Sequence, residues 1–94
     1  MDLRNFRWPI DGGPPVQLVD VTEQEVIEAI TTDAEWRFEH PVDDLMLHIW
    51  SVTAGGRFLF VLLSRSDRLG MWWPGLARPM TAREQDLYRK EIGR

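Results

Sequence analysis

The chain has 94 residues, 44% of them hydrophobic, with five Trp and four Phe, which is typical of one small domain (residues 1–94) with a packed core. The absence of cysteine excludes a disulfide framework, a thiolate metal site and a cysteine nucleophile. No apolar run approaches the roughly 18 residues that a membrane span needs, and the N-terminus has no apolar signal segment, so we expect a cytoplasmic protein that does not enter the membrane.

The net charge of −4 hides an asymmetry between the two halves of the chain. Residues 1–47 carry three basic and eleven acidic side chains, a balance of −8. Residues 48–94 carry eight basic and four acidic side chains, a balance of +4. A polyanion such as RNA is therefore expected to bind the second half. The alternative is that both sets of charges form the solvated faces of an ordinary domain.

The first third of the chain predicts an arm, a loop and a helix. Residues 1–15 are expected to form an extended arm or edge strand followed by a loop, because two glycines and two prolines interrupt any regular element there. A helix is expected to begin at Thr22, since Glu25 has the spacing of a capping box, and to end near residues 31–33. Its apolar stripe is expected to consist of Val26, Ile27 and Ile30.

Four strands are expected in the middle of the chain. Residues 58–63 are six consecutive large apolar residues, which predicts a central strand covered on both faces. Alternation predicts strands over residues 35–40, ending at Pro41, and over residues 45–52. A fourth strand is expected over residues 69–73, ending at Pro74-Gly75. Within the second of these strands, Leu45, Leu47 and Ile49 are expected on one face, and Met46, His48, Trp50 and Val52 on the other.

A last helix is expected to begin at Thr81, where Glu84 repeats the capping-box spacing, and to end at Gly93. Its apolar stripe is expected to consist of Leu87, Tyr88 and Ile92. Because the strands are joined by short polar turns, they predict an antiparallel sheet of about four strands with both helices packed on one face. The fold class is therefore expected to be α+β.

Few residues suggest a metal or cofactor site. His40 and His48 are the only histidines, and they do not have the spacing of metal ligands, so we expect neither a metal nor a cofactor. The adjacent Trp72 and Trp73 are more informative. On a strand one ring enters the core while the other lies on the opposite face, where an element, a partner or a nucleobase covers it. We favour burial in the core or by a partner, and predict both residues as partner-binding.

Arginine is the residue type that carries the functional hypothesis. Guanidinium groups stay charged and match phosphate geometry with a planar set of donors. The arginines of the second half fall at predicted strand ends, turns and the last helix start, so they are expected to converge on one edge of the sheet. A ribonuclease can use such groups for charge stabilisation, with Tyr88 or a carboxylate for proton transfer. The arginines concerned are Arg57, Arg65, Arg68, Arg78 and Arg83.

The second half also resembles a known family. Residues 56–61 (GRFLFV), residues 74–81 (PGLARPMT) and the Glu84 to Tyr88 spacing are similar to the BrnT-type toxins of the RelE/ParE superfamily. Residues 21–26 (VTEQEV) resemble the start of that family's helix. The resemblance implies the small α+β toxin fold, metal-independent endoribonuclease activity and neutralisation by a DNA-binding antitoxin, in a type II toxin–antitoxin system.

The resemblance assigns roles to particular residues. Together with the arginine hypothesis it predicts a catalytic set of Arg57, Arg78, Glu84 and Tyr88, and an RNA-binding set of Arg65, Arg68, Arg83 and Lys90. The expected partners are an antitoxin and RNA or the ribosome. The alternative is a non-enzymatic interaction domain of the same fold, because the family's His-Gly is replaced here by Val19-Asp20. In that case Arg78 and Glu84 pair beside the helix start and Tyr88 belongs to the core.

A specific expectation concerns Arg78, which lies between two prolines, Pro74 and Pro79. Proline cannot donate a backbone hydrogen bond, so this segment is expected to be an extended turn and not a paired strand. The Arg78 side chain is then free to bind a phosphate or a partner carboxylate, which we favour over a structural contact with Glu84.

Overall fold

The computed structural model describes residues 16–43, 45–65 and 72–93. The predicted arm at residues 1–15 and the beginning of the predicted strand at residues 69–71 lie outside these ranges. The fold is α+β, as predicted. Its elements are β1 (Gln17–Leu18), α1 (Glu23–Thr31), the short 3₁₀ helix η2 (Ala34–Trp36), β2 (Phe38–Asp43), β3 (Met46–Val52), β4 (Phe58–Arg65), β5 (Trp72–Pro79) and α2 (Ala82–Ile92).

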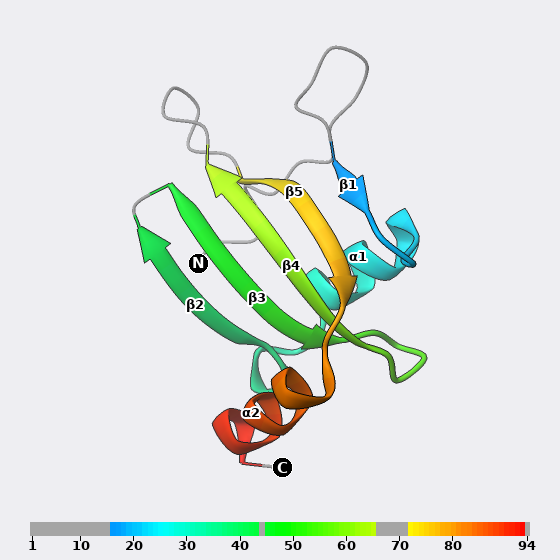
Figure 1. Cartoon of the computed structure of the whole chain (residues 1–94), viewed down its shortest axis with the longest axis vertical. Helices are drawn as coiled ribbons and strands as arrows, with labels where there is room; N and C mark the ends of the chain where they lie inside the picture. The colour runs from blue at the N-terminus through cyan, green and yellow to red at the C-terminus, as the bar shows by residue number, and fades with distance from the viewer. Residues whose placement is uncertain (1–15, 44, 66–71, 94) are drawn as a thin grey trace.

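One five-stranded sheet has the strand order β1-β5-β4-β3-β2, so β4 is its middle strand, as predicted (Figure 1). The four strands β2 to β5 pair antiparallel with their neighbours. The fifth strand, β1, pairs parallel with β5 through Gln17 and Leu18 alone, which makes the sheet mixed. The expected antiparallel sheet of about four strands is thus confirmed for β2 to β5. Two residues are too few for the alternation that identifies a strand, so β1 left no signal in the sequence.

The middle strand explains the layering of the molecule. Its side chains alternate between the two faces of the sheet, and both sets are apolar. Val61 and Leu63 lie in one core with Val26 and Ile30 of α1. On the opposite face, Phe60 lies in a second core that also contains Met80 and Tyr88 of the α2 end of the chain.

The two helices therefore lie on opposite faces of the sheet, and the expectation that both pack on one face is wrong. A strand that is apolar on both sides needs a cover on each side, because one layer of helices leaves large side chains in water. In Figure 1 α1 lies across one face, while α2 lies at the end of the sheet where β2 and β4 begin. The predicted stripe of α1 is corrected at one position: Ile27 is exposed, and Ala29 is buried in its place.

Two proline positions also differ from the prediction. We expected strands to end at Pro41 and at Pro74-Gly75, but β2 continues to Asp43 and β5 to Pro79. β2 is an edge strand, where a missing donor is tolerated, and its register shifts beside Pro41.

In β5, Pro74 pairs with Leu63, and a bulge follows at Gly75. Beyond the bulge Arg78 pairs with Phe60. The expectation that Arg78 occupies an unpaired turn is therefore wrong, because the bulge allows β5 to continue beyond Pro74.

The start of the predicted strand at residues 35–40 also differs. η2 occupies its first residues, so β2 begins only at Phe38.

Both helix starts are confirmed, and both are capping boxes. At α1 the Glu25 N–H donates to Thr22 Oγ1 over 3.2 Å, and the Thr22 N–H donates to Glu25 Oε1 over 3.0 Å. At α2 the Glu84 N–H donates to Thr81 Oγ1 over 3.2 Å, and the Thr81 N–H donates to Glu84 Oε1 over 2.9 Å. Gly93 ends α2 with a φ of 73°, a left-handed angle that suits glycine.

The cap of α2 is testable because Thr81 is exposed and its hydroxyl accepts a hydrogen bond from the Glu84 N–H. We expect Thr81→Ala to lower the free energy of unfolding by about 1 kcal/mol, since the Glu84 N–H loses its acceptor. Thr81→Ser keeps the hydroxyl and is expected to unfold like the wild type. Urea denaturation followed by circular dichroism compares the three proteins. Equal stability of the alanine and serine variants would contradict the capping role.

Candidate functional site

The face of the sheet that carries α2 also carries a row of rings, which we call the aromatic face. Cross-strand pairing places these side chains next to one another, because directly opposite residues share a face. Ring centroids lie 5.8 Å apart for Phe38 and Trp50, 6.3 Å for His40 and His48, and 4.9 Å for His48 and Phe60. Trp73 joins the row because it pairs with Ser64, two residues beyond Leu62 on the same side of β4. The aromatic face consists of Phe38, His40, His48, Trp50, Phe60 and Trp73.

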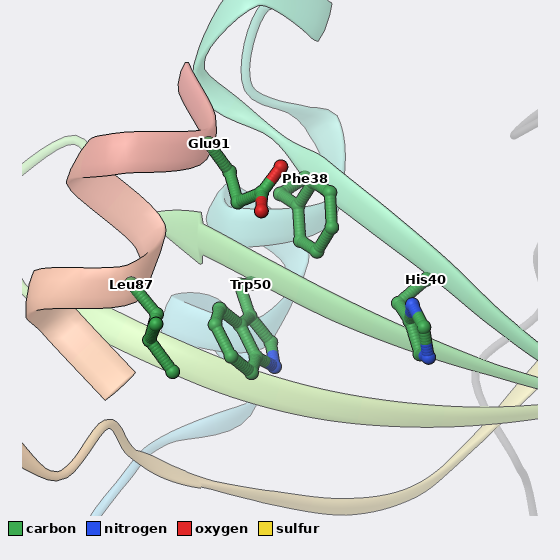
Figure 2. Close-up of a pocket in the computed structure, with 5 residues that line it drawn as sticks. All are labelled: Phe38, His40, Trp50, Leu87 and Glu91. Carbon is green, nitrogen blue, oxygen red and sulfur yellow. The ribbon is translucent and has the colours of Figure 1, made fainter. Parts of the chain in front are cut away.

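A pocket of about 220 Å³ opens between this face and α2 (Figure 2). Phe38, His40 and Trp50 line it from the sheet, and Leu87 and Glu91 line it from α2. Leu87 and Glu91 are four residues apart, so they lie on the same side of the helix. The indole N–H of Trp50 is buried and has no hydrogen-bond acceptor among the residues that the structure describes. The pocket therefore joins an apolar wall to one exposed carboxylate.

Arg78 lies on the same side of the sheet, but its guanidinium is engaged. Its two terminal nitrogens donate to the two Glu84 carboxylate oxygens over 2.7 and 2.9 Å, and one also donates to the Pro79 carbonyl over 3.1 Å. The guanidinium carbon lies 4.5 Å from the centre of the Phe60 ring. The hydrogen bonds from Arg78 lower the pKa of Glu84, and those same bonds raise the pKa of Arg78. The structural pairing that the sequence left as an alternative is thus present, while the binding role stays a prediction.

A double-mutant cycle measures this pair. We expect Arg78→Ala and Glu84→Gln to be coupled by about 1 kcal/mol in the free energy of unfolding, since the pair is bidentate but partly exposed. Arg78→Lys keeps the charge, loses the second hydrogen bond, and is expected to fall between wild type and Arg78→Ala. Chemical denaturation of the four proteins of the cycle gives the coupling. Strictly additive effects would show that the pair does not contribute to stability.

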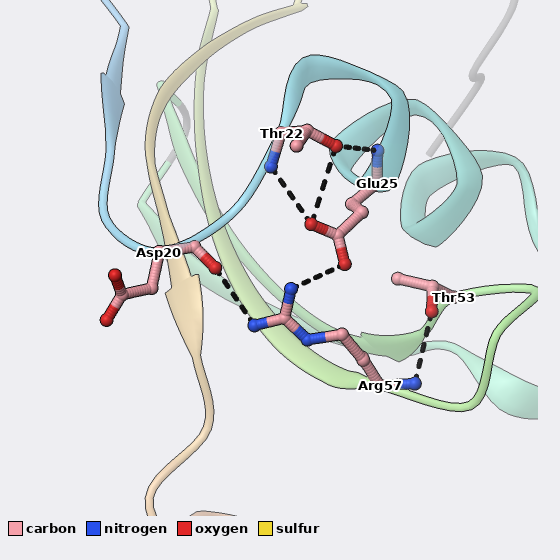
Figure 3. Close-up of polar contacts among 5 residues, drawn as sticks. All are labelled: Asp20, Thr22, Glu25, Thr53 and Arg57. Carbon is pink, nitrogen blue, oxygen red and sulfur yellow. Dashed lines mark hydrogen bonds and ion pairs between the residues drawn. The ribbon is translucent and has the colours of Figure 1, made fainter.

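Arg57 also makes intramolecular contacts, on the other side of the sheet (Figure 3). Its guanidinium donates to Glu25 over 2.6 Å and to the carbonyl oxygen of Asp20 over 2.9 Å. Hydrogen bonds from the Thr22 backbone and, secondarily, from Arg57 hold the pKa of Glu25 below its ordinary value of 4.5. Because α1 and the aromatic face lie on opposite faces of the sheet, Arg57 and Arg78 are not brought into one site.

Tyr88, the fourth predicted catalytic residue, is fully buried. Its hydroxyl donates a hydrogen bond to the carbonyl oxygen of Trp36, and its ring meets the ring of Phe58 edge to face. These contacts join α2 to η2 and to the start of β4. The Tyr88 hydroxyl therefore faces the interior, as expected if the residue belongs to the core.

The predicted RNA-binding residues do not form one patch. Arg65 is exposed at the last residue of β4, whereas Arg83 and Lys90 are exposed on α2, at the opposite end of the sheet (Figure 1). Arg68 lies outside the described residues. Of the two predicted partner-binding residues, Trp72 packs against the core beneath α1, and Trp73 belongs to the aromatic face, half-buried.

Sequence reasoning missed the residues that line the pocket. In the sequence, His40 and His48 lack the spacing of metal ligands and Trp50 is expected only on one face of its strand, so neither pattern links Phe38 with Trp50 or His40 with His48. The signal that links them is register: each pair is directly opposite across β2 and β3. Such pairing is not visible in a single sequence, because it depends on where the turn between the strands places the register.

The imidazole of His48 is affected by its surroundings. Burial lowers its pKa below the ordinary 6.5, with further lowering by the nearby His40 and Arg78 and a small opposing effect of Glu84. A base with a lowered pKa binds a proton less well in the folded than in the unfolded state. As the pH falls below 6.5, protonation therefore favours the unfolded chain until the folded protein is protonated too.

This gives a pH test for His48. Between about pH 7.5 and about pH 5.5 we expect wild type to lose more stability than His48→Gln, because glutamine does not titrate. Urea denaturation at both pH values measures the difference. An equal loss in both proteins would mean that His48 does not contribute to the acid sensitivity.

Among the described residues there is no group of three or more His, Asp or Glu side chains that could hold a metal ion. In the same part of the chain no helix is long and apolar enough to cross a membrane. Comparisons with protein-family models, curated protein sequences and solved structures find no match to this chain. The functional argument therefore depends on the geometry and on the sequence motifs.

Proposed function

We propose that this protein is the toxin-like component of a cytoplasmic type II toxin–antitoxin pair, that it binds single-stranded RNA on the aromatic face, and that a DNA-binding antitoxin neutralises it. The motif resemblance to BrnT-type toxins supports the system. The observation that carries the RNA-binding part is the aromatic face, a row of adjacent rings on one side of the sheet.

Adjacent rings on a sheet suit RNA because unpaired bases stack on aromatic side chains, and each stacked base contributes about 1–3 kcal/mol. Trp73 and His48 are half-buried, so part of each ring remains available to a ligand. Arg78 lies over Phe60 in the same row, with its guanidinium paired to Glu84. The face thus offers mainly stacking surface to a ligand.

Cleavage is a separate property from binding. Metal-independent cleavage needs one group that accepts the proton of the ribose 2′-hydroxyl and another that protonates the leaving oxygen. Tyr88 is buried and Glu84 is held by Arg78, so neither is poised for these tasks in this conformation. We therefore place RNA binding ahead of RNA cleavage in this proposal.

Titration of a fluorescent single-stranded RNA, followed by anisotropy at several salt concentrations, tests the binding. We expect affinity to fall as salt rises, and Trp73→Ala to weaken binding because a stacking surface is lost. Gln24→Ala changes an exposed residue of α1 on the other face and serves as the control. Gel analysis of the same RNA reports cleavage, and growth after induction, with and without a co-expressed neighbouring gene, reports toxicity. Absence of RNA binding at low salt would refute the proposal.

The second candidate is a non-enzymatic protein-interaction domain of the same fold. It is favoured by one specific observation: Arg57, Arg78 and Tyr88 each make an intramolecular hydrogen bond that supports the fold. Under this hypothesis the motif residues are retained for stability and no RNA binds. The salt titration separates the two candidates, since only the first predicts salt-dependent affinity for RNA.

A further inference from the structure

The pocket beneath α2 has two adjoining aromatic walls. The rings of Phe38 and Trp50 have centroids 5.8 Å apart and planes inclined by 62°, so they meet as a corner and do not close into a parallel stack. Leu87, whose side chain is exposed, forms the facing apolar side, and His40 lies at the far end (Figure 2). A cation beside such rings is attracted by their electron-rich faces.

The charge of the pocket comes from Glu91. Figure 2 shows its carboxylate turned toward the Phe38 ring, although the residue is exposed. Glu25, Glu39 and Glu84 each hold an arginine at 2.6–3.1 Å, whereas Glu91 has no ion pair within residues 16–43, 45–65 and 72–93. The pocket thus contains a carboxylate that has no counter-ion among the described residues, next to two aromatic rings.

The Glu91 carboxylate and the two aromatic rings together favour a flat cation as the ligand of this pocket. A phosphate is repelled by Glu91, while a guanidinium can pair with the carboxylate and lie flat on an aromatic ring. The methylene groups of an arginine suit the apolar side formed by Leu87. Residues 1–47, which include Phe38 and His40, carry a balance of −8 and residues 48–94 a balance of +4, so the local attraction for a cation comes from Glu91 itself.

We propose that this pocket binds an arginine side chain of a partner protein. Glu91 pairs with the guanidinium, Trp50 and Phe38 stack on it, and Leu87 contacts its stem. The pocket shares Phe38, His40 and Trp50 with the aromatic face, whereas Trp73, at which RNA binding is tested, does not line it. The arginine proposal concerns a protein partner, and its test at Glu91 does not depend on RNA affinity.

Chemical-shift titration of the ¹⁵N-labelled full chain tests the site. The probe is N-acetyl-arginine N-methylamide, and its matched control is the citrulline analogue, which has nearly the same shape and no charge. We expect saturable shifts at the indole N–H of Trp50 and the amides of Leu87 and Glu91 with the arginine compound alone. Glu91→Gln is expected to weaken this binding at least about threefold, because the cation loses its carboxylate.

Glu23→Gln removes another exposed carboxylate, from α1 on the other face, and is expected to leave the affinity unchanged. A third titration uses guanosine 5′-monophosphate. Equal binding of arginine and citrulline compounds, shifts that map outside the pocket, no binding, or binding of the nucleotide in place of arginine would each overturn the proposal. The anisotropy titration with RNA is read separately, so a failure here does not decide whether RNA binds the aromatic face.

Discussion

The architecture depends on the burial of β4 from both sides. β4 carries Phe60 and Leu62 on one face and Val61 and Leu63 on the other. In a sheet without helices on both sides, one of these apolar faces would be exposed to water. The chain meets this constraint with α1 on one side and α2 on the other. Because α2 has only eleven residues and lies at one end of the sheet, part of the second face remains available. The aromatic face and the pocket result from this incomplete cover.

The same device holds both helices to the sheet. Each helix begins with a capping box whose glutamate also forms an ion pair with an arginine in or beside a strand. Arg57 pairs with Glu25, and Arg78 pairs with Glu84. The glutamate therefore accepts from its own cap and from a neighbouring element at once, near the positive end of the helix. This arrangement gives the motif residues a physical reason for their spacing that does not require catalysis.

Local patterns predicted the capping boxes, the central strand and the two faces of β3, because each is decided by residues close in sequence. The opposite placement of the helices, the two-residue β1 and the passage of β5 through Pro74 depend on pairings between distant segments, which a single sequence does not display. For the site, the sequence pointed to Arg78 and Glu84 and proposed their pairing as an alternative. It did not reveal the pocket, which needs the register of β2 against β3 and the position of α2.

The outer strand β2 restricts how a partner can approach the sheet. β2 contains Pro41 and a shift in register, so this border does not offer a long, regular ladder of free backbone groups. Extension of the sheet by a strand from another molecule is disfavoured there. Recognition at this border is thereby directed to side chains, and its irregularity protects a small, strand-rich protein against edge-to-edge aggregation.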